Sequence, residues 1–238
     1  MRKSAFALFI SFFTLSACDI LEQAGQTLSI PTEAEMADGL RQALEVGTGD
    51  AVSFLNTEGG YLNYPRFKIP FPPDVQRVAQ KARDLGFGDK VDEFIERMNR
   101  GAEDAAAEAK PIFVNAVKAM TIADAKGILL GEDNSATLYF KGKTSQQLYS
   151  AFSPKIKLSL DKFEATKYWT DITTLYNKVP GVQKVNTDLV AYATNKALDG
   201  LFLKLSEEEK EIRDNVSART TPLLQKVFGW AATQQAGQ

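Results

Sequence analysis

The chain has 238 residues, with 28 basic and 30 acidic side chains, one cysteine and no histidine. Its mixed, mildly acidic charge argues against nucleic acid as a partner. The lack of histidine excludes Ser-His-Asp and Cys-His catalysis in their usual form, and histidine-ligated zinc. A lone cysteine excludes an internal disulfide, a cysteine-based metal site and a redox pair.

Residues 1–17 have the layout of a secretory signal peptide. Arg2 and Lys3 precede an apolar run, from Ala5 to Ala17, that is shorter than the roughly 20 residues of a membrane-spanning helix. We therefore favour a cleaved signal over an uncleaved anchor. The run ends in Leu15-Ser16-Ala17-Cys18, and these four residues resemble the lipobox of bacterial lipoproteins.

The lipobox resemblance implies that Cys18 is acylated and becomes the first residue of the mature protein. Residues 18–31 are then a lipidated tether, and the lipid is the expected contact with a membrane, because no second apolar run of spanning length follows. An ordinary cysteine in a discarded signal peptide is the alternative. Asp19 resembles the inner-membrane retention signal of enteric bacteria. We expect a protein anchored in the bacterial cell envelope that faces the periplasm, with the inner membrane favoured.

Residues 32–230 predict a single all-α domain, a bundle of about eight or nine helices, followed by a frayed tail over residues 231–238. A Pro-rich segment, residues 61–73, follows the first helix. Its four prolines exclude a helix interior and favour extended backbone in the residue before each. We expect this segment, named the strap, to lie extended across the helical body.

The first predicted helix begins with a local signal. Thr32 and Glu35 fit the capping box, and apolar residues continue at helical spacing to Leu55. Gly47 and Gly49 weaken the middle of this helix, and we allow for a break there.

The longest helix is predicted from Val91 to Ala109, where apolar residues follow the 3-4 spacing closely. Asp89 is its expected N-cap. Pro111 is expected to kink or restart the helix, and Thr121 to cap a shorter one.

Several breaks are predicted in the second half of the chain. Thr144 is expected to cap a helix that Pro154 interrupts. Residues 156–160 alternate like a strand, although the continuing helical spacing favours a helix. Ser206 is expected to begin a new helix, and a last helix is expected from Pro222 to Phe228.

A series of short segments runs through residues 30–229 in a fixed order: Gly60-Tyr61-Leu62-Asn63, Ile69-Pro70-Phe71-Pro72, Met98-Asn99-Arg100-Gly101-Ala102-Glu103, Ala109-Lys110-Pro111-Ile112-Phe113, Met120-Thr121-Ile122-Ala123-Asp124-Ala125, Ala136-Thr137-Leu138-Tyr139-Phe140, Lys196-Ala197-Leu198-Asp199-Gly200-Leu201-Phe202, Glu208-Glu209-Lys210-Glu211-Ile212-Arg213, Arg219-Thr220-Thr221 and Val227-Phe228-Gly229. In this order they resemble the bacterial lipoprotein family known as domain of unknown function 4197. That family has no assigned activity, so the resemblance implies no particular chemistry.

Two further motifs are weak. Gly142-Lys143-Thr144 is similar to the end of a P-loop, but Thr137 stands where the first glycine is required and no predicted strand precedes it. Residues 132–135 form an acidic loop without the ligand alternation and distant glutamate of an EF-hand. We therefore predict neither a metal site nor a cofactor.

A predicted helix opens with Glu207, Glu208, Glu209 and Glu211, where the helix dipole favours acidic residues. We interpret them as a solvated face rather than as catalytic carboxylates. Glu209 and Arg213, four residues apart, are expected to pair on that face and to contribute a few tenths of a kcal/mol.

Polar side chains within apolar stripes form the candidate site. A buried carboxylate needs a partner, and Glu103 and Asp199 both lie among apolar neighbours in the sequence. We favour a structural ion-pair network that fixes helix register. The alternative is a polar pocket under the strap that binds a small ligand. The candidate ligand-binding residues are Asn63, Arg66, Asn99, Arg100, Glu103, Asp199, Arg213 and Arg219.

These patterns predict an envelope lipoprotein that acts as a membrane-tethered binding or interaction module, with an unknown protein or small molecule as its partner. One alternative is a histidine-free hydrolase or lyase that uses carboxylates and arginine, which requires a cleft with an acid of displaced pKa. Another is a structural envelope protein that acts through an exposed apolar patch of several hundred Å².

Overall fold

The structure is a computed structural model that describes residues 30–236, apart from residues 74–75, 163, 179, 182–183 and 185–187. Within this part the protein is one all-α domain, as predicted, and every regular element is a helix. Residues 1–29, which include the predicted signal peptide, Cys18 and most of the tether, lie outside the described residues.

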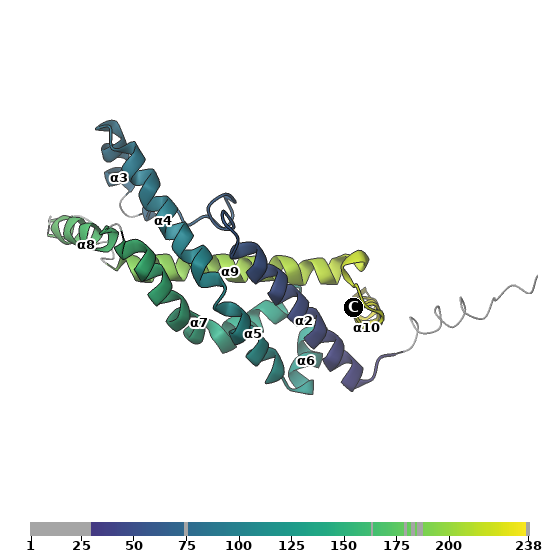
Figure 1. Ribbon diagram of the computed structural model, residues 1–238. Coiled ribbons are helices and arrows are strands. Elements are labelled where there is room, and N and C mark those ends of the chain that lie inside the picture. The colour runs from purple at the N-terminus through teal and green to yellow at the C-terminus, as the bar shows by residue number, and fades with distance from the viewer. Residues whose placement is uncertain are drawn as a thin grey trace, which may run out of the picture.

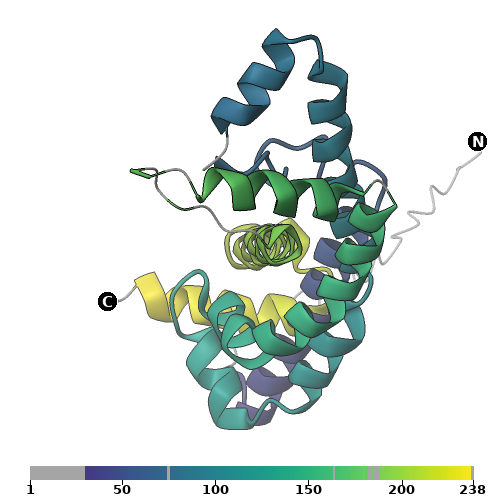
Figure 2. The same ribbon diagram turned by 90° about the vertical axis from the view of Figure 1, so that its left-hand side faces the viewer.

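The long helix α9 (Leu189–Asp214) lies across the middle of the domain (Figure 1). Figure 2 shows it nearly end-on, with the other helices around it. It packs against α2 (Glu33–Leu55) and α7 (Ser135–Asp161), and α7 also packs against α4 (Gly88–Ala106). The remaining elements are α3 (Gln76–Asp84), α5 (Ala109–Lys118), α6 (Ile122–Leu129), α8 (Ala165–Tyr176), the short 3-10 helix η2 (Val216–Ala218) and α10 (Pro222–Ala236).

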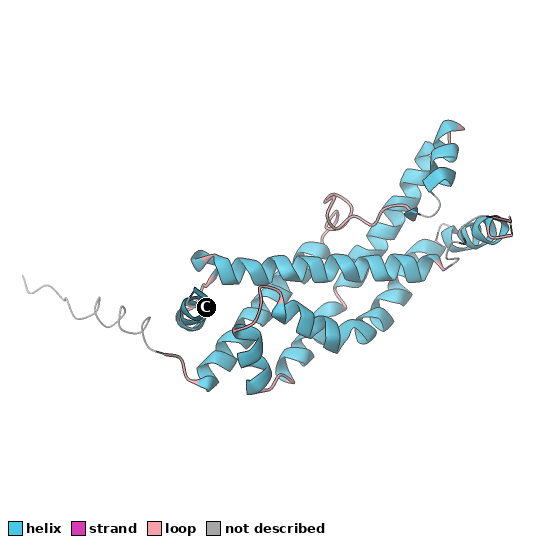
Figure 3. Ribbon diagram, turned by 180° about the vertical axis from the view of Figure 1, so that it is seen from behind, coloured by secondary structure: helices cyan, strands magenta, loops and turns pink. Residues whose placement is uncertain are grey.

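The two ends of the elongated body differ. α3 and the beginning of α4 form a hairpin that projects from one end, whereas α2 begins at the other (Figures 1 and 3). No helix in the described part of the chain combines the length and the apolar character that a membrane span requires.

Helix α2 begins at the predicted capping box. Thr32 Oγ1 accepts a hydrogen bond from the Glu35 N–H at 3.2 Å, and Glu35 Oε2 accepts one from the Thr32 N–H at 2.8 Å. The helix continues through Gly47 and Gly49 to Leu55, so the break allowed for there is absent. The cost of two glycines, about 1 kcal/mol each, is offset because the apolar face of α2 packs against α9, α6 and α10.

Three predicted helix boundaries are wrong because tertiary packing overrides the local signal. Thr144 and Pro154 both lie inside α7. Phe152, Ile156 and Leu160 continue one fully buried face on both sides of Pro154, so the helix favoured for residues 156–160 is confirmed. Ser206 lies inside α9, where the buried face runs on to Ile212.

The eight or nine helices predicted therefore do not correspond to the long helices of the described residues. Helices of twelve residues or more are α2, α4, α7, α8, α9 and α10, six in all, and α3, α5 and α6 are shorter. α4 ends at Ala106 and α5 restarts at Ala109, next to Pro111 as predicted. α10 continues past the predicted end at Phe228 to Ala236.

The strap lies against α4 and α9. Residues 61–63 and 65–67 form turns rather than the extended backbone predicted, and residues 68–70 have no regular structure. Tyr61 is fully buried, and a Cβ on Gly200 of α9 would lie 2.8 Å from its ring carbon Cε1. Phe71 ends the strap against Phe94 of α4 and Trp169 of α8, with ring centroids 5.1 Å and 5.9 Å away.

Candidate functional site

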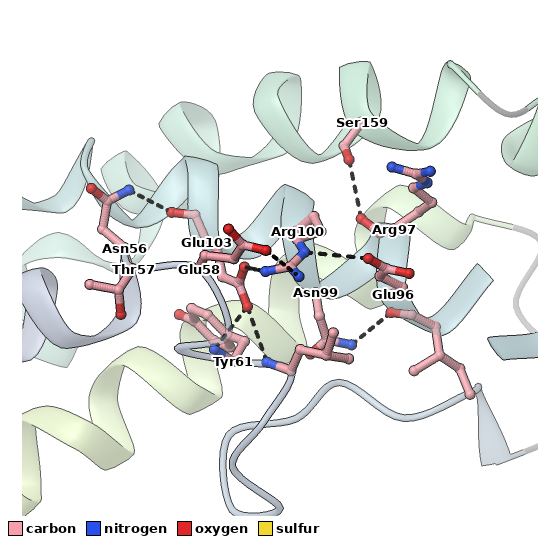
Figure 4. A network of polar contacts seen from close by, with 12 residues as sticks. Asn56, Thr57, Glu58, Tyr61, Glu96, Arg97, Asn99, Arg100, Glu103 and Ser159 are labelled. Atoms are coloured by element: carbon pink, nitrogen blue, oxygen red, sulfur yellow. Dashed lines mark hydrogen bonds and ion pairs between the residues drawn. The ribbon is translucent and has the colours of Figure 1, made fainter. Parts of the chain in front are cut away.

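Glu103 of α4 holds the beginning of the strap (Figure 4). The residue is 3% exposed. Its Oε1 accepts hydrogen bonds from the backbone N–H groups of Tyr61 at 3.2 Å and Leu62 at 3.1 Å, and its Oε2 accepts one from Arg100 at 2.8 Å. Both oxygens of this buried carboxylate therefore bind groups of the same chain.

Asn99, one turn earlier on α4, holds the end of the strap. Its Oδ1 accepts from the Ile69 N–H at 2.8 Å, and its Nδ2 donates to the carbonyl oxygens of Ile69 at 2.9 Å and Ile95 at 2.7 Å. Asn99 thus pairs with both polar groups of one strap residue, as a neighbouring β-strand would. Since Asn99 is fully buried, these bonds satisfy backbone groups that would otherwise be unpaired.

Arg100 connects this network to the surface. Its guanidinium lies 3.1 Å from the carboxylate of Glu58 and 3.6 Å from that of Glu96, besides the bond to Glu103. The hydrogen bond and charge of Glu103 raise the pKa of Arg100 further above its usual value. Burial and the same carboxylate raise the pKa of Tyr61, whose hydroxyl donates to the Ala197 carbonyl at 2.8 Å. The phenol is therefore a neutral donor at physiological pH.

A second buried network joins α9 to the ends of α6 and α7. The side chains of Glu209 and Arg213 are 5% and 6% exposed and lie 2.9 Å apart. Glu209 accepts from the N–H groups of Ala136 and Thr137, both at 2.9 Å, in the first turn of α7. Arg213 donates to the carbonyls of Ile128 at 2.8 Å and Leu129 at 3.2 Å, at the end of α6.

Arg219 performs a similar role at the end of α9. Its guanidinium donates to the carbonyl oxygens of Ile212 at 3.0 Å and Arg213 at 2.5 Å. Burial lowers the pKa of this side chain. Glu209, Arg213 and Arg219, the three buried charged side chains at this end, thus bind helix termini. Helix termini carry the backbone groups that a helix leaves unpaired.

The other candidate residues lie on the surface. Asn63 is exposed, and the exposed Arg66 forms an ion pair with the half-buried Glu207 at 2.6 Å. The expected burial of Asp199 is wrong: its side chain is 60% exposed and pairs with Lys196 at 3.1 Å. Its position on α9 turns it away from the buried neighbours Leu198 and Leu201, because consecutive helical residues point in directions about 100° apart.

The structure therefore does not gather the eight candidates into one pocket. One group lies under the strap, a second lies at the ends of α6, α7 and α9, and Asp199 stands apart from both. Comparison with family models gave a match over residues 30–229 to the family described as protein of unknown function (DUF4197). The chain belongs to that family. Comparison with curated proteins gave no match, and comparison with solved structures gave none either.

In this DUF4197 chain, the sequence analysis did not predict that Glu209 is buried. Its pairing with Arg213 is confirmed, but the exposed face expected for both is wrong. Glu209 lies on the same face of α9 as Leu205 and Ile212, which are also buried, and that spacing was the available signal. Its partner Thr137, which also donates its hydroxyl to Glu209 at 2.9 Å, gives no signal in the sequence.

The DUF4197 domain also has open grooves that involve other residues. A groove of about 220 Å³ between α7 and α9 is lined by Lys141, Tyr149, Asp199 and Phe202 among others. A larger one, of about 400 Å³, lies between α5, the beginning of α6 and α7; we name it the α5–α7 groove. Among the described residues, no group of three or more Cys, Asp and Glu side chains could hold a metal ion.

Proposed function

We propose that this DUF4197 protein is a lipid-anchored binding or interaction module of the bacterial cell envelope. The observation that carries the proposal is the order of residues at the N-terminus: Arg2 and Lys3, the apolar run, and Leu15-Ser16-Ala17-Cys18. Acyl chains on Cys18 hold the domain at a membrane, facing the periplasm, and Asp19 favours the inner membrane. More than one chain gives stable anchoring, whereas a single one binds marginally.

The length of the predicted tether sets an upper limit on the distance between the domain and the membrane. Residues 18–31 span at most about 50 Å when fully extended. The domain can thus stand off the membrane or lie on it, and its partner can be another envelope protein or a small molecule.

The occupied carboxylates support a binding role over an enzymatic one. A general acid or base must exchange a proton with a substrate that it contacts. Both oxygens of Glu103 bind the strap and Arg100, and both oxygens of Glu209 bind α7 and Arg213. A histidine-free hydrolase or lyase built on these groups would first have to give up these contacts.

A structural protein with one apolar patch has less support as well. The exposed large apolar side chains come from several elements, among them Val46 of α2, Leu138 of α7 and Val216 of η2. Leu85 and Phe87, at the turn between α3 and α4, are 75% and 59% exposed and are close together in sequence.

The test is metabolic labelling with radioactive palmitate, combined with the mass of the purified chain. The wild type is expected to carry label and to lack residues 1–17, whereas Cys18→Ser carries none. Ser16→Ala, which keeps a small residue, serves as the control and should still be labelled. An unlabelled wild type, or a wild-type chain that retains residues 1–17, overturns the proposal.

Fractionation gives a second readout. A chain in which residues 1–18 are replaced by a cleavable secretory signal should leave the membrane fraction, because no helix of the described domain has the character of a membrane span. The same sedimentation with membranes as in the wild type would show that the lipid is not the anchor.

A further inference from the structure

The α5–α7 groove brings together side chains that the buried networks do not use. Its volume of about 400 Å³ lies within the roughly 300–1,000 Å³ of small-molecule sites. Ile112 and Ala116 of α5 line it with apolar surface, and Asp124, Tyr139 and Lys143 line it with polar groups. Such a combination of apolar surface and a few convergent polar groups is typical of ligand sites.

Lys143 supplies a cation with free donors. Its ammonium nitrogen lies 5.7 Å from the centroid of the Tyr139 ring, where the ring face attracts a positive charge. No ion pair joins it to a carboxylate of the described residues, whereas Lys155 and Lys157 on the same helix pair with Glu108 and Asp161. The three N–H donors of Lys143 are therefore available to a negatively charged group.

Asp124 supplies an anion with one free oxygen. Its Oδ2 accepts from the Thr121 N–H at 3.1 Å and hydroxyl at 2.7 Å, which closes the capping box of α6. Its Oδ1 accepts no hydrogen bond from the described residues. The Thr121 bonds, with a contribution from the charge of Lys143, lower the pKa of Asp124, so the carboxylate is ionised at neutral pH.

Two neutral amide side chains, one on α5 and one on α7, also line the groove. Asn115 and Gln147 are exposed side chains that line it, and each amide offers both donors and an acceptor. Peptide bonds offer the matching groups. The small side chains of Ala116 and Ala119 leave room for a narrow ligand.

We infer that the α5–α7 groove binds a small zwitterion of the amino-acid or short-peptide class, with its ammonium on Asp124 and its carboxylate on Lys143. A ligand with only one charge would leave either Asp124 or Lys143 without a charged partner. This inference makes the proposed binding role specific. It is independent of the acyl anchor, because the groove lies wholly within the helical domain.

Titration calorimetry of the full chain in mild detergent at low ionic strength tests the inference, with alanine, dialanine and trialanine as probes. One of the three is expected to bind saturably, and its length distinguishes a free amino acid from a peptide. Acetylation of its amine and amidation of its carboxylate should each weaken binding at least about fivefold, since each removes a charge-assisted contact. No saturable binding in the series, or binding that both modifications leave unchanged, overturns the inference.

Variants locate the site. Lys143→Met and Asp124→Asn should weaken binding of the free peptide to a similar degree, and Lys143→Met should leave the affinity for the amidated peptide unchanged. Lys118→Met is the matched control, because this exposed lysine of α5 does not line the groove. Thermal melts establish that each variant is folded. Equal binding by Lys143→Met and Lys118→Met would place the ligand elsewhere, whatever the outcome of palmitate labelling.

Discussion

Glu209 and Arg213 lie one turn apart on α9 and together cap two other helices. The carboxylate accepts from the first N–H groups of α7, and the guanidinium donates to the last carbonyls of α6. Each charge also faces the helix end of opposite partial charge, which the helix dipole favours. One buried ion pair therefore fixes the positions of three helices.

We expect Glu209→Ala to lower the free energy of unfolding by about 3–5 kcal/mol, because it leaves Arg213 buried without its carboxylate and two N–H groups of α7 unpaired. Urea unfolding followed by circular dichroism measures this. Glu211→Ala, an exposed glutamate on the same helix, is the control and should change stability by less than about 0.5 kcal/mol. Similar losses for the two variants would contradict the capping role.

Asn99→Ala should release the end of the strap. The variant loses bonds to both polar groups of Ile69, and we expect a loss of stability of about 2–4 kcal/mol from unpaired buried groups. Hydrogen exchange should accelerate at the Ile69 amide and less at Tyr61, which Glu103 still holds. Asn63→Ala, on the exposed part of the strap, should leave both amides unchanged. Unchanged exchange at Ile69 in Asn99→Ala would refute this role.

Two glycine-to-alanine substitutions should act in opposite directions. In Gly200→Ala the new Cβ lies 2.8 Å from the ring of the buried Tyr61, and we expect a net destabilisation of about 1–3 kcal/mol from overpacking. In Gly142→Ala nothing lies within 4 Å of the new Cβ, so α7 should gain up to about 1 kcal/mol of helix propensity. Melting temperatures compare the pair, and a shift of the same sign in both would count against the packing of the strap on α9.

The lowered pKa of Glu35 predicts that the stability of the fold depends on pH in the acid range. Hydrogen bonds from Lys226 and the Thr32 backbone lower the pKa of Glu35 from 4.5 to about 2. Because the folded-state pKa lies below the unfolded one, the stabilisation is fully present above about pH 4.5 and is lost as the pH falls towards 2. Nuclear magnetic resonance titration should place the Glu35 midpoint near 2 in the wild type and higher in Lys226→Met. Lys126→Met, which removes a partner of Glu33 instead, should leave that midpoint unchanged.

Local sequence signals were confirmed at the starts of α2 and α6, where both partners lie within one helical turn, whereas the expected N-cap Asp89 lies in the first turn of α4, after Phe87. The capping boxes of Thr32 with Glu35 and Thr121 with Asp124 follow from residues three apart. Thr121 was predicted as a cap, and α6 does begin at Ile122. The all-α class follows in the same way from apolar residues at helical spacing.

Signals that depend on burial were less reliable. Pro154 and Ser206 looked like helix breaks, yet packing of α7 and α9 continues on both sides of each. Asp199 looked buried because of its sequence neighbours, whereas the helix turns it to solvent.

By itself the sequence determined the helical class, the capped starts of α2 and α6, and the family resemblance, while the lipid anchor stays a prediction. Only the tertiary structure decided what the buried charges bind. Glu103 reaches a backbone group 42 residues away in the chain, and Glu209 one 73 residues away. The reason is physical: backbone N–H groups are present at nearly every residue, so the sequence carries no mark of which ones a distant carboxylate will meet until the helices have packed.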